Sequence, residues 1–274
     1  MRFADPRTDF TFKRIFGNEQ AKEVLISFLN AVLGLDEAHA IKQVTLLDPY
    51  EAPKTKYLRD SFLDVKCLDA RGVSFIVEMQ VSYVAGFEKL VIYNASKAYA
   101  NQLLKGEPYP KLNQVISINI LDFTLFDDFE HYLSCHEIRE KITGNCYLDD
   151  IRYYFIELPK FTKREAELES YIEKWVYFIK HAGDLEAIPD QLNEPAFQKA
   201  FALANRASMT PKELEAYEAS IIVMLDERGR IDGAYELGEQ SKARDIARAM
   251  KQNNMANELI AKLTGLPLAK VERL

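Results

Sequence analysis

The fold is decided by one short stretch of the chain, VSFIVEMQV at Val73–Val81. Its apolar and β-branched residues are typical of a strand, yet Glu78 and Gln80 lie within it. Because side chains along a strand point alternately to opposite faces, one face is wholly apolar and the other carries both polar side chains. A polar face on a core strand indicates a functional site at that face.

A second strand-like run, SFLDVKCLD at residues 61–69, precedes this stretch and is joined to it by a turn. If residues 70–72 form a three-residue loop, with Gly72 at the positive φ that such loops need, Asp64 lies directly opposite Glu78 in an antiparallel hairpin. Cross-strand neighbours on one face have Cβ atoms about 4.5–5.5 Å apart. A loop of two or four residues would instead send the two acids to opposite faces.

The facing carboxylates of Asp64 and Glu78 indicate a metal site. Two ionised carboxylates this close repel each other unless one is protonated or a cation lies between them. Mg²⁺ takes carboxylate oxygens at about 2.0–2.1 Å and keeps several waters, one of which Gln80 could orient. The arrangement is typical of metal-assisted hydrolysis of a phosphate ester. For a single acid such as Asp64, the alternative is a solvated residue on an exposed face.

The remaining periodicities predict a small α/β core. A helix is expected over residues 18–33, whose apolar side chains follow one helical face and which Gly34 ends. A second helix is expected over residues 86–104. The element order αβββαβ predicts a mixed sheet flanked by helices. Strands are expected at residues 41–49, 61–69, 73–81, 115–121 and 152–158.

Two connections are expected to lack regular structure. Residues 49–60, PYEAPKTKYLRD, are polar and contain two prolines. Residues 126–150 are expected to be irregular, with one short helical piece.

The chain after residue 160 is expected to be helical, with interruptions near Gly183, Pro189 and Pro211. Residues 212–252 could form one long helix, whose apolar stripe either packs on its own domain or serves self-association. The last segment, ELIAKLTGLPLAKVERL, has the proportions of a helix-turn-helix, but its second helix has too few basic residues for a major-groove reader.

Two regions follow from these patterns. We expect a first domain at residues 1–160 and a helical region at residues 161–274 that packs on the chain or forms a homodimer.

Composition and charge narrow the class of protein. A chain of 274 residues with 48% hydrophobic and 28% charged residues is ordinary for a globular protein. Its first residues mix charges of both signs, and no run approaches the roughly 18 apolar residues of a membrane span, so a cytoplasmic location without membrane contact is expected. The three cysteines and four histidines have no metal-binding spacing. Neither a disulfide framework nor a zinc site is therefore indicated.

The net charge of −7 is unevenly distributed along the chain. Residues 1–125 contain 15 acidic and 15 basic side chains, so residues 126–274 carry the whole deficit. A neutral first domain does not exclude a nucleic-acid partner, although it does not by itself indicate tight non-specific binding to DNA.

These motifs together resemble the PD-(D/E)XK nuclease superfamily, in which an aspartate and an E-x-K or E-x-Q element on paired strands bind the catalytic metal. More narrowly, residues 5–125 resemble the Rpn family of recombination-promoting nucleases, also described as transposases. The resemblance is carried by Asp64 with Glu78-Met79-Gln80, by DFTFKRIFGNE and LISFLNAVLGL, by the strand VISINILDF, and by the spaced set Tyr93, Tyr99, Gln102, Leu103, Gly106 and Tyr109.

The resemblance implies a restriction-endonuclease-like α/β core and an endonuclease that cuts DNA with Mg²⁺, or with Mn²⁺ or Ca²⁺. Asp64 and Glu78 would be the metal ligands. Gln80 would be the third catalytic residue, in the position that many relatives fill with lysine. Because glutamine offers only a neutral dipole where lysine carries a fixed charge, slow catalysis or greater reliance on the metal is expected.

Five further residues are candidates for a supporting or substrate-binding role. Asp9 and Lys13 lie four apart and could meet on one helical face, although the alternative is a local ion pair. Glu23 could supply a third acid from the first long helix, or only a charge that suits a helix start. Tyr99 and Gln102 could reach the substrate phosphate or a site water, or could serve packing.

Three functions remain open from the sequence. The first is a metal-dependent DNA endonuclease linked to recombination or mobile elements. The second is a DNA- or protein-binding module on a nuclease scaffold that has lost its chemistry. The third is a transcription regulator that acts through the carboxy-terminal helices.

Overall fold

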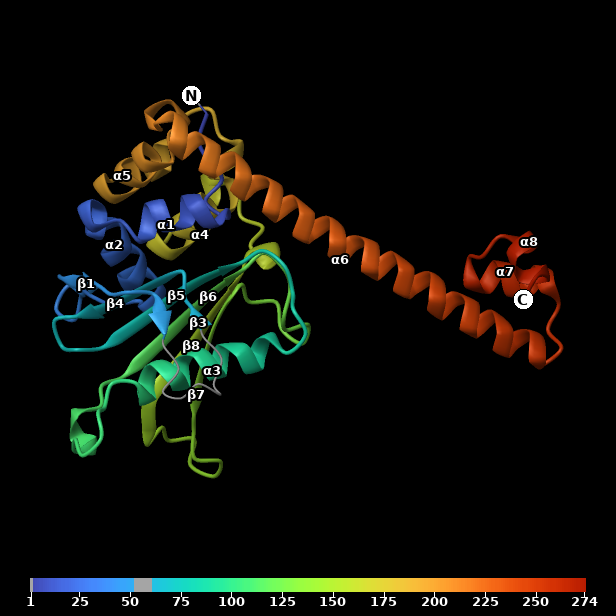
Figure 1. Cartoon of the computed structure of the whole chain (residues 1–274), viewed down its shortest axis with the longest axis horizontal. Coiled ribbons are helices and arrows are strands. Elements are labelled where there is room, and N and C mark those ends of the chain that lie inside the picture. The colour runs from blue at the N-terminus through green and yellow to red at the C-terminus, as the bar shows by residue number, and fades with distance from the viewer. Residues whose placement is uncertain (1, 52–60) are drawn as a thin grey trace. The chain divides into compact units, whose positions relative to one another are not determined.

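The computed structural model describes residues 2–51 and 61–274 (Figure 1). The chain forms two compact units, residues 1–222 and residues 223–274. The first unit is built on a six-stranded mixed sheet of strand order β1-β4-β5-β6-β8-β7. This confirms the predicted α/β fold with a mixed sheet flanked by helices.

The central strands of the sheet are parallel and its outer pairs are antiparallel. β5 pairs with β6, and β6 with β8, in parallel, whereas the β1–β4, β4–β5 and β7–β8 pairs are antiparallel. Two short strands, β2 and β3, form a separate two-stranded sheet. The strands are β1 (Val44–Leu46), β2 (Tyr50–Glu51), β3 (Ser61–Phe62), β4 (Val65–Asp69), β5 (Ser74–Gln80), β6 (Val115–Leu121), β7 (Leu133–Ile138) and β8 (Leu148–Glu157).

Helices cover both faces of the sheet (Figure 1). Four helices, α1, α2, α4 and α5, lie on one face, and α3 lies on the other. Short 3-10 turns connect several elements. The helices are α1 (Asp9–Phe16), α2 (Lys22–Leu33), α3 (Phe87–Ala100), α4 (Tyr171–His181), α5 (Pro195–Ala204), α6 (Pro211–Gln252), α7 (Asn257–Thr264) and α8 (Leu268–Glu272).

The larger hydrophobic core lies between the four-helix layer and the apolar face of β5, which carries Phe75 and Val77. Trp175 of α4 is fully buried at its centre, and its indole Nε1 donates a hydrogen bond to Ser27 Oγ at 3.2 Å. Because buried aromatic rings contribute large apolar area, this cluster holds α1, α2, α4 and α5 to one another. The rings packed around Trp175 are those of Phe16, Phe28, Phe178 and Phe197.

The β4–β5 hairpin has the register that its three-residue loop predicts. Val65 pairs with Val77 and Leu68 with Ser74, and Gly72 has φ +86°. The paired register ends at Val65–Val77, and Asp64 and Glu78 are the next residues of the two segments.

Several sequence-based boundaries differ from the structure. The strand expected at residues 61–69 is broken at 63–64 into β3 and β4. The expected irregular connection at 126–150 is wrong, because it contains β7 and the beginning of β8. The helix expected from residue 18 begins as a 3-10 turn, and α2 follows it from Lys22. In the polar connection 49–60, Tyr50–Glu51 forms β2, and residues 52–60 lie outside the described residues.

The chain after residue 160 is helical apart from 3-10 turns and short connections, and the long helix expected at 212–252 is confirmed as α6. The second unit has a small core of its own, formed by Ala247, Ile260, Leu266 and Val271. The turn between α7 and α8 contains Gly265 in the left-handed conformation. Across the described ranges, no helix combines the length and the apolar character needed to span a bilayer.

Candidate active site

Asp64 lies at the point where β4 stops pairing regularly with β5. Its Oδ2 accepts a hydrogen bond from the backbone N–H of Met79 at 2.8 Å. The preceding Leu63 packs with Ile76 and Ala95 on the α3 face, although strict alternation would place it with Val65 on the opposite face. This bend at residues 63–64 frees the Met79 N–H for the Asp64 side chain.

Glu78 of β5 lies beside Asn119 of β6 and is an electrostatic neighbour of Asp64. Burial raises the pKa of Glu78 well above its ordinary value, and the negative charge of Asp64 raises it further, while a hydrogen bond with the backbone of Asp64 acts in the opposite direction. Glu78 Oε1 is buried and has no hydrogen-bond partner among the described residues. A buried, unpartnered carboxylate oxygen is costly unless a proton or a cation satisfies it.

Asp64 shares this environment. Burial raises its pKa above the ordinary value, whereas the hydrogen bond from Met79 and the positive charge of Lys13 lower it. The negative charge of Asp9 raises it again. The pair therefore disfavours full ionisation of both carboxyl groups in the absence of a nearby cation.

Lys13 of α1 is a cation at this pair. Its Nζ lies 2.6 Å from Asp9 Oδ1 and 3.6 Å from Asp64 Oδ1. Burial opposes the charged form of Lys13, but its contacts with Asp9 and Asp64 raise its pKa. The spacing of four residues thus brings Asp9 and Lys13 together on α1. Lys13 also contacts Asp64, which precedes β4.

The side chain of Gln80 is held beside the site by a local contact. Its Nε2 donates a hydrogen bond to the backbone carbonyl of Ser82 at 3.0 Å. The hydroxyl of Ser82 is buried and has no hydrogen-bond partner in the described part of the chain.

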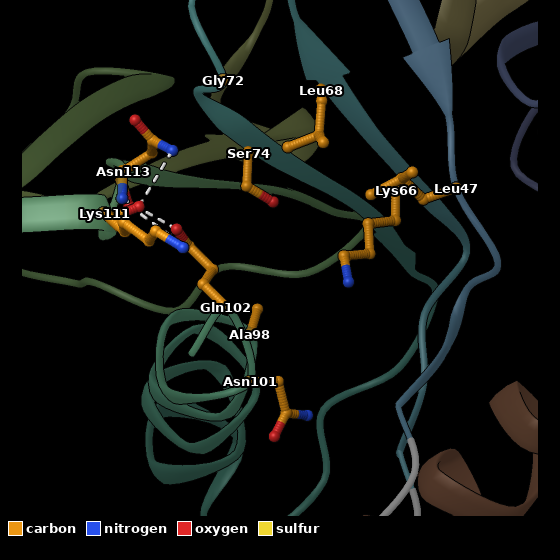
Figure 2. A pocket seen from close by; sticks show the side chains of 10 residues that line it. All are labelled: Leu47, Lys66, Leu68, Gly72, Ser74, Ala98, Asn101, Gln102, Lys111 and Asn113. Carbon is orange, nitrogen blue, oxygen red and sulfur yellow. Dashed lines mark hydrogen bonds between the residues drawn. The ribbon is translucent and has the colours of Figure 1, made fainter. Parts of the chain in front are cut away.

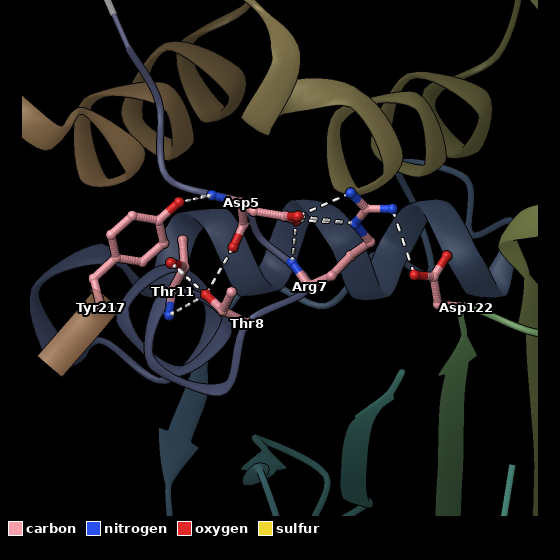
Figure 3. A network of polar contacts seen from close by, with 6 residues as sticks. All are labelled: Asp5, Arg7, Thr8, Thr11, Asp122 and Tyr217. Carbon is pink, nitrogen blue, oxygen red and sulfur yellow. Dashed lines mark hydrogen bonds and ion pairs between the residues drawn. The ribbon is translucent and has the colours of Figure 1, made fainter. Parts of the chain in front are cut away.

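A charged network connects the segment before α1 to the end of β6 (Figure 3). Arg7 pairs with Asp5 at 2.8 Å and with Asp122 at 3.4 Å. The backbone N–H of Asp122 donates to the Gln80 carbonyl at 2.9 Å. Thr8 is the N-cap of α1, and its side chain accepts a hydrogen bond from the backbone N–H of Thr11. This network positions α1, and with it Lys13, relative to the end of β5.

Three further candidates have contacts elsewhere. Glu23 forms an ion pair with Lys199 of α5 at 4.0 Å, and it is not among the charges that most affect the pKa of Asp64 or Glu78. The Tyr99 hydroxyl donates a hydrogen bond to Asp150, which raises the pKa of Tyr99 to about 12.

Gln102 contacts the backbone of Asn113 through both of its amide atoms, at 2.9 and 2.8 Å. The structure thus brings Asp64, Glu78 and Lys13 together, and it engages Glu23, Tyr99 and Gln102 in other contacts.

Two buried amides, one on β6 and one on α3, were not among the sequence candidates. Asn119 is buried next to Glu78, and its Nδ2 donates to Ser117 Oγ and to the Tyr154 carbonyl. Asn94 of α3 is also buried, and its Oδ1 has no partner among the described residues. The alternation of Ser117 and Asn119 with isoleucines was a usable signal, because it marks a polar face on an otherwise buried strand.

The donor set suits a hard divalent cation. Carboxylate oxygens are the ligands that Mg²⁺, Mn²⁺ and Ca²⁺ prefer, and the unpartnered Glu78 Oε1 provides one beside Asp64. In the described ranges, no group of three or more histidine, cysteine, aspartate or glutamate side chains could hold a metal ion. Asp64 and Glu78 are therefore a two-carboxylate candidate, and water or substrate oxygens would complete its coordination.

Comparison with known proteins identifies the family. A family model described as PD-(D/E)XK nuclease family transposase matches residues 6–234. No curated protein and no solved structure gives a match. The family match covers most of the chain and includes the hairpin with Asp64 and Glu78, and the fold around that hairpin is the α/β core expected of a PD-(D/E)XK nuclease. The chain belongs to the PD-(D/E)XK nuclease family of transposases.

Proposed function

We propose that this protein is a divalent-metal-dependent DNA endonuclease that hydrolyses phosphodiester bonds during recombination or transposition. The observation that carries the proposal is the buried Glu78 carboxylate, whose Oε1 has no partner in the described part of the chain and whose pKa is raised by burial and by Asp64. A cation between the two carboxylates would remove this unfavourable arrangement. Family membership supports a nuclease or transposase-related role.

Asp64 and Glu78 would hold the ion, with Mg²⁺ as the expected species. When bound, a divalent ion supplies an acidified water and neutralises charge on the phosphate. Lys13 would bind a non-bridging phosphate oxygen, and the distance of 3.6 Å between its Nζ and Asp64 Oδ1 supports this role. It would then supply the fixed positive charge that many relatives supply from the position of Gln80. Gln80 would orient water through its amide.

The test is nicking of supercoiled plasmid DNA in a titration with Mg²⁺. We expect cleavage by the wild-type protein and none by Asp64→Asn or Glu78→Gln. Glu88→Gln, which removes an exposed carboxylate in the first turn of α3, is the matched control and should cleave normally. Titration calorimetry with Mg²⁺ provides a second readout, in which Glu78→Gln should give no heat of binding. Plasmid cleavage that persists in both site variants would overturn the proposal.

A second candidate is a DNA- or protein-binding module that uses the nuclease scaffold without efficient cleavage. The specific observation in its favour is Gln80, whose amide is neutral and is engaged with the Ser82 carbonyl. This candidate predicts that the protein retains labelled DNA in a gel-shift experiment and leaves plasmid intact with Mg²⁺, Mn²⁺ and Ca²⁺. Measurable turnover with any of these ions would favour the endonuclease.

We also propose a homodimer formed through the carboxy-terminal helices. Large apolar side chains of α6 are exposed, among them Val223, Tyr235 and Leu237, and exposed apolar residues in number favour a protein contact. Light scattering coupled to gel filtration should give twice the chain mass. Leu237→Lys with Tyr235→Lys should return it to the mass of one chain, and a monomeric wild-type protein would exclude this arrangement.

A further inference from the structure

The side of α3 that faces the sheet contains an asparagine whose carbonyl oxygen is unsatisfied. Asn94 is buried, with 9% of its surface exposed, and its Oδ1 has no hydrogen-bond partner among the described residues. Burial of such an oxygen is unfavourable, because it loses its hydrogen bonds to water and gains none from the protein. An oxygen of this kind needs an explanation, and a bound ion is one of the few that a folded protein offers.

The position of Asn94 over the sheet follows from its neighbours on α3. Ala98, one turn after Asn94, lines the same pocket as Ser74 of β5, and Figure 2 shows Ala98 on the side of α3 that faces Ser74. Ala95 packs in one cluster with Ile76 of β5. Positions nearer the start of α3 therefore lie over positions nearer the end of β5.

The preceding turn of α3 continues this arrangement. Val91 packs in one cluster with Leu121 of β6, and Leu121 pairs with Gln80 in the register of β5 and β6. Because side chains alternate along a strand, Glu78 shares the α3-facing side of β5 with Gln80. Asn94 follows Val91 by three residues and so lies on the same helical face, over the part of β5 that carries Glu78.

Two buried oxygens without partners thus belong to facing elements, Asn94 Oδ1 on α3 and Glu78 Oε1 on β5, if only the described residues are considered. When Glu78 is ionised both oxygens accept hydrogen bonds, so neither satisfies the other. The adjacent Asn119 already donates its amide group to Ser117 Oγ at 3.1 Å and to the Tyr154 carbonyl at 3.2 Å. A cation is a partner that both oxygens can share.

The chemistry of an asparagine suits this position. Carboxamide oxygens are ligands of hard divalent cations, as carboxylates are. The charges of Asp64, Glu78 and a divalent ion sum to zero, so a neutral third ligand adds an oxygen without burying a further charge. Within the described ranges, no third histidine, cysteine, aspartate or glutamate joins the two carboxylates.

We propose that Asn94 Oδ1 is a third protein ligand of the divalent cation that Asp64 and Glu78 hold. The inference rests on the metal site of the proposed function and extends that site from the β4–β5 hairpin to α3. A cation bound in this way connects α3 to the sheet, and it satisfies both unpartnered oxygens at once.

The first experiment measures Mg²⁺ binding to the full chain by titration calorimetry. Asn94→Leu replaces the amide by an apolar side chain of similar size, and it should bind Mg²⁺ on the order of 10–100-fold more weakly than the wild type. Asn94→Asp keeps an oxygen at this position and should bind Mg²⁺ at least as tightly as the wild type. Equal Mg²⁺ affinities of Asn94→Leu and the wild type would overturn the proposal.

The second experiment distinguishes a ligand from a structural asparagine by thermal unfolding without metal. Asn94→Leu removes an unpartnered buried oxygen, so it should not lower Tm. The matched control is Asn30→Leu, because Asn30 of α2 exchanges two hydrogen bonds with the backbone of Ile41, at 3.0 and 2.8 Å. The control should lower Tm and leave Mg²⁺ affinity unchanged. The same pair of results for Asn94→Leu would assign Asn94 a structural role and reject the proposal.

Two measures keep this inference separate from the proposed endonuclease. Asn94→Ala carries the same tests if Asn94→Leu does not fold, and plasmid cleavage is scored independently of metal binding. Mg²⁺ binding that needs Glu78 but not Asn94 rejects only the third ligand. Binding that needs both residues, without cleavage of plasmid, supports the ligand and rejects the endonuclease. A wild-type protein that binds none of Mg²⁺, Mn²⁺ and Ca²⁺ rejects both.

Discussion

At the scale of single residues, Glu78 is the group whose environment conflicts most with its ionised form. Its pKa is raised well above the ordinary value of 4.5, first by burial and then by the charge of Asp64. The folded chain therefore holds a proton over a pH range in which the unfolded chain has released it. Because stability falls with rising pH wherever the folded state binds more protons, this group costs the metal-free protein stability above pH 4.5.

Glu78→Gln should therefore stabilise the metal-free protein at pH 8. A glutamine is neutral at every pH, so the variant should lose the part of the pH dependence that Glu78 causes. A gain of about 1 kcal/mol raises Tm by about 2–4 °C in a domain of this size, and a rise of that order is expected in a calorimetric scan. Added Mg²⁺ should raise Tm in the wild type only. An unchanged or lower Tm in the metal-free variant would contradict this account.

Lys13 allows a second prediction at this scale. Its Nζ is 3.6 Å from Asp64 Oδ1, so Lys13→Gln should leave the fold intact and lower the cleavage rate. Removal of one group that stabilises transition-state charge costs on the order of 10²-fold in kcat, and gel quantification of plasmid nicking would detect that decrease.

Lys22→Gln is the matched control for Lys13→Gln, because Lys22 also forms a surface ion pair, with Glu19 at 2.6 Å. Lys13→Arg should recover part of the rate. Equal rates in Lys13→Gln and wild type would assign Lys13 to a local ion pair with Asp9.

At the scale of elements, Gly72 sets the paired register of β4 and β5, beyond which Asp64 and Glu78 are the next residues. Its φ of +86° is disfavoured for any residue with a Cβ, and such a Cβ would also meet Asn113 Nδ2 at 3.0 Å. Gly72→Ala should lower the free energy of unfolding by about 1–2 kcal/mol from the backbone conformation alone. Urea denaturation measures that change.

Gly34→Ala is the control for Gly72→Ala, because Gly34 also has a positive φ but a Cβ there meets nothing within 4 Å. Gly34→Ala should lower the free energy of unfolding only through backbone strain, because the added Cβ meets no neighbouring atom. A Gly72 variant as stable as wild type would show that the hairpin tolerates another loop.

The β4–β5 hairpin and β7 show which structural features the sequence could predict. The hairpin register was predictable, because a three-residue loop with a terminal glycine has few alternatives and one strand face is apolar. The bend at residues 63–64 was not, since it depends on Leu63 packing beneath α3. β7 was missed because it is an edge strand whose residues are half-buried or exposed on both faces, which leaves no alternation to detect.

For the candidate site, contacts between residues close in sequence could be predicted from their spacing, whereas tertiary contacts could not. The spacing of four between Asp9 and Lys13 predicted their contact, which the structure confirms at 2.6 Å. It gave no indication that Lys13 also reaches Asp64. For Tyr99 and Gln102, a single sequence could not distinguish a role at a site from hydrogen bonds to Asp150 and Asn113, because those partners are distant along the chain.

At the scale of the whole molecule, the compact units divide the chain after residue 222. The boundary expected at residue 160 lies inside the first unit. Helices α4 and α5 belong to the large core of the sheet, which includes Trp175 and Phe201. Helical periodicity indicates that one face of each helix is buried, but it does not indicate which surface covers it. The first 16 residues also depend on this region, because Tyr217 and Glu213 contact Asp5 and Arg14.

Truncation tests this division. A fragment of residues 1–222 keeps the large core and both carboxylates, so it should unfold cooperatively and retain Mg²⁺-dependent nicking within a few-fold of the full chain. A fragment of residues 1–160 lacks the aromatic side chains of α4 and α5 and would expose the apolar face of α2, so it should aggregate or show no cooperative transition. Circular dichroism during heating and plasmid nicking measure both fragments. If residues 1–160 fold and cut DNA, the helices after residue 160 are not part of the catalytic domain, and the assignment of α4 and α5 to its core fails.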